Sequence, residues 1–204
     1  MGILTGRLKP FSRMLTEWQV LNTRLGTSWV KTSDTSPWWD NERSSISVLA
    51  GAIWLSGGWA FEEGSAQKAF SGSRRNHRGR CDINFQVGNQ EFVAEAKKCW
   101  PNIGNTETAK SIVEASLKAA ICDAGRISDA WCPRLGIVFA SPMLHYSRQD
   151  EMDLLISAFI AEAVKIRGVS VAWTFPRAAC NLRPTNQYRN YIFPGAVMVI
   201  HSVD

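Results

Sequence analysis

Residues 79–98, GRCDINFQVGNQEFVAEAKK, place the tightest constraint on the fold because two alternating apolar segments flank Gly88-Asn89. A two-residue loop with glycine first is typical of a type II′ hairpin turn. Such a turn fixes the register, so Val87 faces Gln90 and every opposed pair has the same sum of residue numbers. The sequence therefore predicts an antiparallel hairpin with a defined register.

This register sets Asp82 opposite Glu95, and Arg80 opposite Lys97. Side chains alternate along a strand, so the hairpin has two distinct faces. The apolar face is expected in the core and carries Cys81, Ile83, Phe85, Val87, Phe92, Ala94 and Ala96. The other face is polar apart from Val93 and carries Arg80, Asp82, Asn84, Gln86, Glu91, Glu95 and Lys97.

Directly opposed carboxylates have Cβ atoms about 4.5–5.5 Å apart and repel each other unless a cation lies between them. A divalent ion would remove that repulsion, and Mg²⁺ accepts two carboxylates together with waters and a main-chain carbonyl. An alternative needs no metal. Asp82 could pair diagonally with Lys97, and Glu95 with Arg80, which would form a solvated charge lattice without a function.

The remaining segments predict helices and strands around this hairpin. Helical spacing or capping indicates helices near 11–25, 40–56, 105–128 and 147–168, and strands are expected at 57–64, 134–141, 169–175 and 195–203. The order ααβββαβαββ predicts an α/β (α+β) class with a mixed β-sheet flanked by helices. We expect one domain over residues 1–204, with a peripheral N-terminal helix within 1–30 and a core from 38 to 175.

Asp82, followed on the next strand by Glu95-Ala96-Lys97, resembles the D…E-x-K motif of the PD-(D/E)XK nuclease superfamily, which has the restriction-endonuclease-like fold. In that family an acidic residue on a helix precedes a three-stranded meander that carries the motif, and a helix and a strand follow. Glu42 has the position of that acidic residue. Cys81 stands where the family often has proline.

The resemblance implies phosphodiester hydrolysis with Mg²⁺, for which Mn²⁺ could substitute. Asp82 and Glu95 would hold the ion with the Ala96 carbonyl, and Lys97 would orient or help deprotonate the attacking water and stabilise charge on the phosphate. Glu42, expected to point toward the interior, could bind a second ion or a metal-bound water. Alternatively, Glu42 is simply a first-turn glutamate favoured by the helix dipole.

Two further groups could serve the same site. Glu63, or less readily Glu62, comes from the preceding strand and could bind metal, although an exposed role without function is the simpler interpretation. The glycine-punctuated loop SGSRRNHRGR precedes Asp82, and its Arg74, Arg75, Arg78 and Arg80 suit phosphate oxygens.

Composition bears on partners and location. The formal net charge of +5 favours a polyanionic partner, and the resemblance favours DNA over RNA and a possible homodimer. There is no phosphate-binding loop or dinucleotide fingerprint, so no nucleotide cofactor is expected. Five unpatterned cysteines, no signal peptide and no long apolar run predict a soluble cytoplasmic protein without a membrane segment. All nine tryptophans are expected in the core.

The leading hypothesis is therefore a Mg²⁺-dependent DNA endonuclease that acts in restriction, phage defence or mobile-element processing. A different hypothesis retains the fold without catalysis, as a module that binds nucleic acid or a protein partner. A toxin or antitoxin-like protein is a third possibility.

Overall fold

The centre of the protein is a seven-stranded sheet with the strand order β1-β7-β9-β5-β4-β3-β2. The computed structural model describes residues 1–4, 9–29, 36–69, 76–128, 130–179 and 189–203. The sheet strands are β1 (Gly2–Leu4), β2 (Trp59–Ala69), β3 (Asn76–Val87), β4 (Gln90–Cys99), β5 (Arg134–Ala140), β7 (Val169–Thr174) and β9 (Ala196–Ser202). Two short strands, β6 (Leu144–His145) and β8 (Tyr191–Ile192), pair separately.

The sheet is mixed because β4 and β5 run parallel while its other neighbouring strands are antiparallel. The helices of the described ranges are α1 (Ser12–Trp29), α2 (Glu42–Leu55), α3 (Thr106–Gly125) and α4 (Met152–Ala163), with short 3-10 helices at Lys9–Phe11, Tyr146–Glu151 and Arg177–Ala179. The predicted class, a mixed sheet flanked by helices, is confirmed. The short strands β1, β6 and β8 are additions to the predicted order.

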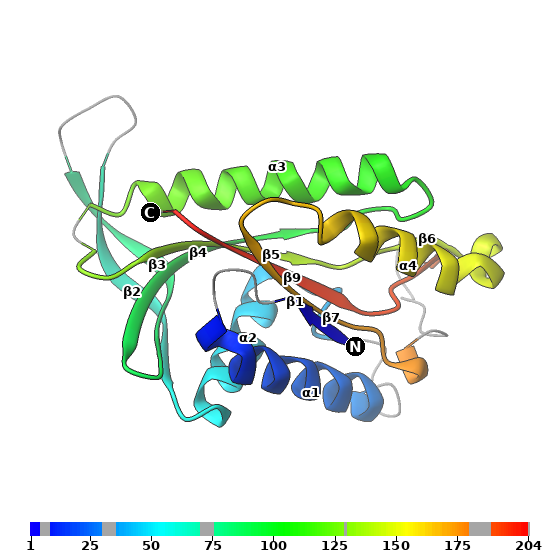
Figure 1. The fold of residues 1–204 in the computed structure, drawn as a ribbon, viewed down its shortest axis with the longest axis horizontal. Coiled ribbons are helices and arrows are strands. Elements are labelled where there is room, and N and C mark those ends of the chain that lie inside the picture. The colour runs from blue at the N-terminus through cyan, green and yellow to red at the C-terminus, as the bar shows by residue number, and fades with distance from the viewer. Residues whose placement is uncertain (5–8, 30–35, 70–75, 129, 180–188, 204) are drawn as a thin grey trace.

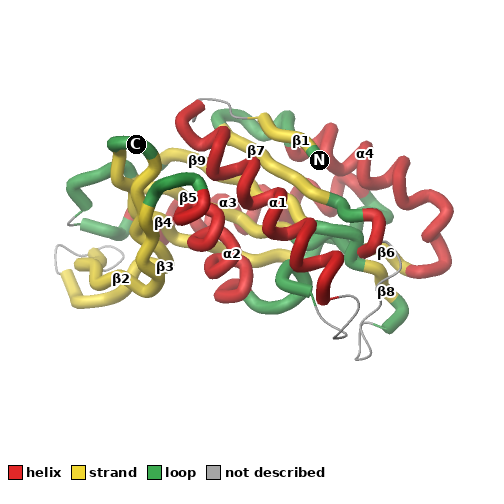
Figure 2. Tube along the Cα trace, turned by 90° about the horizontal axis from the view of Figure 1, so that it is seen from below, coloured by secondary structure: helices red, strands yellow, loops and turns green. Residues whose placement is uncertain are grey.

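The helices form two layers, one on each face of the sheet (Figure 1). Helices α1 and α2 cover one face, and the tube seen from below shows them lying across the strands (Figure 2). Helices α3 and α4 cover the opposite face, where α3 packs on β4 and β5. The helices in the described ranges lack the length and apolar character needed to traverse a lipid bilayer.

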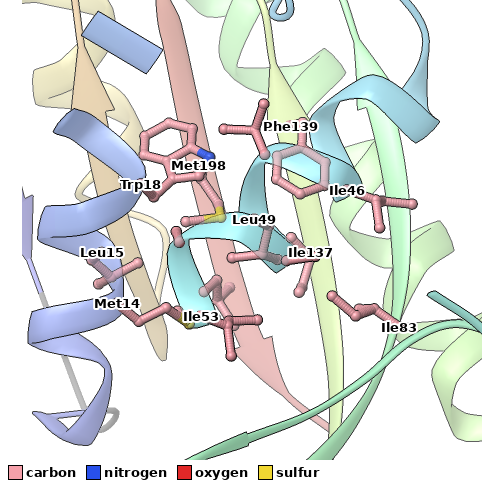
Figure 3. Close-up of a cluster of buried hydrophobic side chains, with 14 of the residues drawn as sticks. Met14, Leu15, Trp18, Ile46, Leu49, Ile53, Ile83, Ile137, Phe139 and Met198 are labelled. Atoms are coloured by element: carbon pink, nitrogen blue, oxygen red, sulfur yellow. The ribbon is translucent and has the colours of Figure 1, made fainter. Parts of the chain in front are cut away.

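The main core lies between the α1–α2 layer and the sheet (Figure 3). Met14, Leu15 and Trp18 of α1 are almost fully buried there, so the expectation of a peripheral N-terminal helix is wrong. The predicted core boundary at residue 175 is also wrong, because β9 lies between β7 and β5 in the sheet interior. Both errors arise because sequence periodicity shows which face of an element is apolar but does not show what covers it.

Helix α2 begins at Glu42 because Asn41 caps it, with the Ser44 N–H donating to Asn41 Oδ1 at 3.0 Å. Asp40, just before the cap, accepts a hydrogen bond from the Ser44 hydroxyl at 2.8 Å. This cap places Glu42 in the first turn, where the helix dipole favours a carboxylate. As the first residue of α2, Glu42 lies close to β4 and accepts a hydrogen bond from the Lys98 backbone N–H.

Three tryptophans contradict the expectation that all nine lie in the core. Trp54 and Trp100 are exposed, and Trp131 is 85% exposed. Trp131 lies in the connection between α3 and β5, where no local periodicity marks a residue as buried or exposed.

Leu49 of α2 is completely buried in the main core, whereas Leu154 of α4 is 70% exposed. We expect Leu49→Ala to lower the free energy of unfolding by about 2–5 kcal/mol, because it removes apolar contacts and leaves a cavity. The control Leu154→Ala should change it by less than about 0.5 kcal/mol. Urea denaturation measures both, and equal losses would contradict this assignment of the core.

Candidate active site

The predicted hairpin register is confirmed by the pairing of β3 with β4, which runs from Val87–Gln90 to Ile83–Ala94. Gly88 has a φ of 61°, and Asn89 is not among the described residues with positive φ. A positive φ at the first loop residue alone is the type II′ geometry. The turn thus sets the register that the sequence indicates.

The ladder between β3 and β4 ends at the pair Ile83–Ala94. The strands separate before the next two residues in register, Asp82 and Glu95. Beyond this point β3 continues beside β2, with Arg80 opposite Ser65, and β4 continues beside β5, with Lys97 opposite Val138. The predicted direct pairs Asp82–Glu95 and Arg80–Lys97 both lie outside the ladder, so this part of the predicted pairing is wrong. The Asp82 carboxylate lies at the separation, where its Oδ2 accepts the Ala96 N–H at 2.7 Å.

The alternation of side chains is also interrupted at this point. On β2, Ala60 belongs to the main core on the α2 side, whereas Ala66 packs with Val93 in a small cluster on the opposite face. Between them, Glu63 has a φ of 56°, the left-handed conformation that non-glycine residues rarely adopt. The left-handed conformation of Glu63 therefore reverses which face of the sheet the side chains of β2 point to, so residues after Glu63 face the opposite side from those before it.

Strand β3 shows the same interruption. Ile83 lies in the main core, but Cys81 lies in the small cluster with Val93 and donates to the Gly64 carbonyl at 3.4 Å. The expectation that Cys81 shares the face of Ile83 is wrong, because it assumed unbroken alternation. Asp82, between them, is thus the residue at which β3 changes face.

Glu95 is buried with only 3% of its surface exposed, on the face where the reversed part of β2 brings Lys68. The Lys68 Nζ lies 2.7 Å from the Glu95 Oε1. The pKa of Glu95 is raised to about 6, because burial and the charge of Asp82 raise it by more than the hydrogen bond and charge of Lys68 and the charge of Lys97 lower it. The Asp82 carboxylate is therefore close enough to Glu95 to raise the pKa of Glu95.

Lys97 forms an ion pair with Asp123 of α3, with a distance of 2.8 Å between Nζ and Oδ2. Burial lowers the pKa of Lys97, but the hydrogen bond to Asp123 and the charges of Asp123, Glu42 and Asp82 outweigh it, so the pKa is raised. Lys97 is consequently a cation at neutral pH. This state suits stabilisation of negative charge better than removal of a proton from water.

Glu42 reaches the same site from the first turn of α2. Burial raises its pKa and so does the charge of Asp82, while the charge of Lys97 and a hydrogen bond from the Lys98 backbone N–H lower it. The structure thus brings Glu42, Asp82, Glu95 and Lys97 together, although they come from three elements.

Glu62 and Glu63 have other partners. The Ser47 hydroxyl donates to Glu62 Oε2 at 3.1 Å, and Glu63 pairs with Arg43 at 3.3 Å and with Arg80 at 3.1 Å. Because Lys97 pairs with Asp123 and Arg80 with Glu63, the diagonal ion pairs of the alternative charge lattice are replaced by pairs to other elements. Glu63 contributes to this site through its left-handed backbone conformation, which directs Lys68 toward Glu95.

The basic loop before Asp82 is partly described. Arg78 and Arg80 lie on β3, in the hairpin arm that continues past the rest of the sheet (Figure 1), and Arg78 is exposed. Arg80 is engaged by Glu63. Arg74 and Arg75 lie outside the described residues.

Sequence reasoning missed three residues of this site. Lys68 and Asp123 pair with Glu95 and Lys97, and Lys98 donates to the Trp38 carbonyl and, at 2.8 Å, to the Ser45 hydroxyl. Burial lowers the pKa of Lys98 to about 7. Lys98 directly follows the E-x-K motif, so the sequence could have indicated it as a further site residue. No local pattern connects Lys68 or Asp123 with the hairpin.

The donor atoms of this site fit a hard divalent cation. Asp82 and Glu95 offer carboxylate oxygens, and the ammonium of Lys68 against Glu95 shows that this position already attracts positive charge. Within the described ranges, no group of three or more His, Cys, Asp or Glu side chains could hold a metal ion. The expected site has only two side-chain ligands, Asp82 and Glu95, and completes its coordination with the Ala96 carbonyl and water, so it is smaller than such a group.

Comparisons of the chain with protein-family models, with curated proteins and with solved structures each return no match.

The raised pKa of Glu95 predicts a pH-dependent stability difference. Its contribution to stability is fully present below about pH 4.5 and is lost as the pH rises through about 6, because the buried side chain favours the protonated form. Relative to the native protein, Glu95→Gln should therefore gain about 1–2 kcal/mol between pH 4.5 and pH 7. Urea denaturation across this range with chelated metal measures it, and a constant difference would contradict the assigned pKa.

The left-handed conformation of Glu63 predicts an unusual order of substitutions. Glu63→Val and Glu63→Asn both remove the ion pairs to Arg43 and Arg80, but asparagine tolerates positive φ far better than valine. Glu63→Val should be less stable than Glu63→Asn by about 1–2 kcal/mol, because a β-branched residue is strained there. Equal thermal stabilities of the two variants would show that the strand does not turn over at this residue.

Proposed function

We propose that this protein is a Mg²⁺-dependent nuclease that hydrolyses phosphodiester bonds in nucleic acid, most simply a DNA endonuclease of the PD-(D/E)XK type. The observation that carries the proposal is the meeting of Asp82 and Glu95 where β3 and β4 separate, with a protonated Lys97 beside them. Two mutually repelling carboxylates next to a fixed cation are costly for folding and useful for phosphoryl chemistry.

In this proposal Asp82 and Glu95 hold Mg²⁺ with the Ala96 carbonyl, and Mn²⁺ can substitute. When bound, the ion supplies polarisation of a phosphate oxygen and acidification of a water molecule. Lys97 stabilises the negative charge that develops on the phosphate, and Asp123 holds its side chain in place. Glu42, whose pKa burial raises, is placed to accept a proton from the attacking water or to bind a second ion.

Charge supports a nucleic-acid partner. The chain has a formal net charge of +5, and the exposed Arg78 lies on the arm that leads into Asp82. Phosphate contacts by such residues position a substrate without reading its sequence. DNA is favoured over RNA by the resemblance of the motif, which also suggests restriction, phage defence or mobile-element processing, and a homodimer.

A second candidate function has its own supporting observation. The Lys68–Glu95 and Lys97–Asp123 ion pairs satisfy the charged side chains within the protein, with distances of 2.7 and 2.8 Å. Such pairs could be purely structural. The protein would then be a catalytically inactive module of this fold that binds nucleic acid or a protein.

Cleavage of plasmid and linear DNA with Mg²⁺ or Mn²⁺ tests the two candidates. Asp82→Ala, Glu95→Ala and Lys97→Ala should each lower the cleavage rate by at least about a hundredfold, because each removes a metal ligand or the charge that stabilises the phosphate. Glu151→Ala removes an exposed glutamate that pairs with Arg148 on the surface and serves as the control with unchanged rate.

Equal cleavage by all of these proteins would identify a contaminating nuclease and remove the basis for the enzyme. DNA binding that is independent of metal and occurs without cleavage would favour the inactive module.

A further inference from the structure

A groove lined by aromatic rings lies on the sheet face that carries Val93 and Glu95. The rings are those of Trp59 and Phe61 from β2 and Trp131 from the connection after α3, and they surround a cavity of about 150 Å³. Phe61 is 60% exposed, and its ring centroid lies 5.4 Å from that of Trp59. The site residues described above do not include any of these rings.

The groove continues toward the carboxylates. Asn84 is paired with Phe61 on one side and with Val93 on the other, and Glu95 is the next residue of β4 on the Val93 face. A second small cavity shares Asn84 and Trp131 with the groove and extends along the same face to Cys81. Residues two apart on a strand are separated by about 7 Å, so the groove ends beside the proposed metal ligands.

Trp131 is fixed in orientation despite its exposure. Its Nε1–H donates to the Glu91 Oε2 at 2.9 Å, which holds the indole beside the start of β4. An exposed ring whose polar edge is held by a carboxylate presents its face to solvent. Base–aromatic stacking requires this presentation, because every nucleobase has a π-face that can lie on such a ring.

The groove also contains a polar group that suits a base edge. Asn84 lines both cavities, and within the described residues its side-chain amide has no hydrogen-bond partner. An amide offers two donors and one acceptor oxygen, which match the mixed donors and acceptors of a nucleobase. An apolar side chain of a partner protein, bound in the groove, would leave the Asn84 amide without a hydrogen-bond partner.

We propose that this groove binds one unpaired nucleobase, stacked on Trp131 and contacting Asn84, next to the phosphate held at Asp82 and Glu95. The inference rests on the proposed nuclease function and narrows its substrate to single-stranded or locally unpaired nucleic acid. The positive charge of the chain and the exposed Arg78 favour a polyanionic occupant over a protein.

The test measures binding without cleavage, using fluorescently labelled oligothymidylate and a duplex of equal length in the presence of EDTA. We expect Trp131→Ala to weaken binding of the single strand on the order of tenfold and to leave duplex binding unchanged. Trp131→Phe should retain most of the affinity because it keeps a stacking face. Trp54→Ala, which removes another exposed tryptophan that lies on α2 and does not line the groove, is the matched control and should have no effect.

A second readout reports stacking directly. A strand containing 2-aminopurine should lose fluorescence when it binds the native protein and Trp131→Phe, and should lose much less when it binds Trp131→Ala. Asn84→Ala should weaken binding of the single strand without removing the quenching, because the ring remains.

Several results would overturn the inference. The first is that the native protein does not bind the single strand. The second is that Trp131→Ala weakens single-strand and duplex binding equally, and the third is that this substitution has no effect. Self-association of the native protein that Trp131→Ala abolishes, with nucleic-acid binding unchanged, would assign the groove to a second copy of this chain.

The binding test and the cleavage test fail separately. If stacking is observed but no metal-dependent cleavage occurs, the groove binds nucleic acid and the nuclease proposal fails. If cleavage depends on Asp82 while Trp131→Ala has no effect on single-strand binding, the nuclease proposal stands and the base site fails.

Discussion

The hydrogen bond from the Ala96 N–H to the Asp82 carboxylate is the interaction on which this site depends. In an ordinary sheet a carbonyl of the neighbouring strand would accept that N–H. Here a side chain accepts it, so β4 can leave β3 and run beside β5 without leaving a buried donor unpaired. Because an unpaired buried donor costs about 1–3 kcal/mol, the separation of the strands requires such an acceptor. Asp82 therefore has a structural task at the position where the proposed chemistry needs a carboxylate.

Two features of the packing explain how charged groups gather at this part of the sheet. Lys68 reaches Glu95 because β2 turns over at Glu63, and Lys97 reaches Asp123 because α3 packs against β4. Each ion pair compensates part of the desolvation of its members. The result is a set of charges held in place by the fold, which is the arrangement that the proposed phosphoryl chemistry requires.

One segment connects this charge set with the aromatic groove. After α3 ends, the chain pairs with the edge of β2, where Ser128 N–H donates to the Gln67 carbonyl at 2.8 Å and Ile127 lies opposite Lys68. Three residues later the same segment presents Trp131 over β4. The contact that holds the strand of Lys68 thus also positions the exposed indole, so the groove and the carboxylates are parts of one arrangement.

The sequence by itself determined the register of the hairpin, the order of the longer helices and strands and the mixed sheet, because turn geometry and side-chain periodicity depend on residues close together in the chain. It also identified Asp82, Glu95, Lys97 and Glu42 as one group. Only the tertiary structure decided that Lys68 and Asp123 are their partners, that the alternation breaks at Glu63, and that Trp131 is exposed. These depend on segments far apart in sequence that meet only when the helices and the edge strand pack, and no local pattern records such contacts.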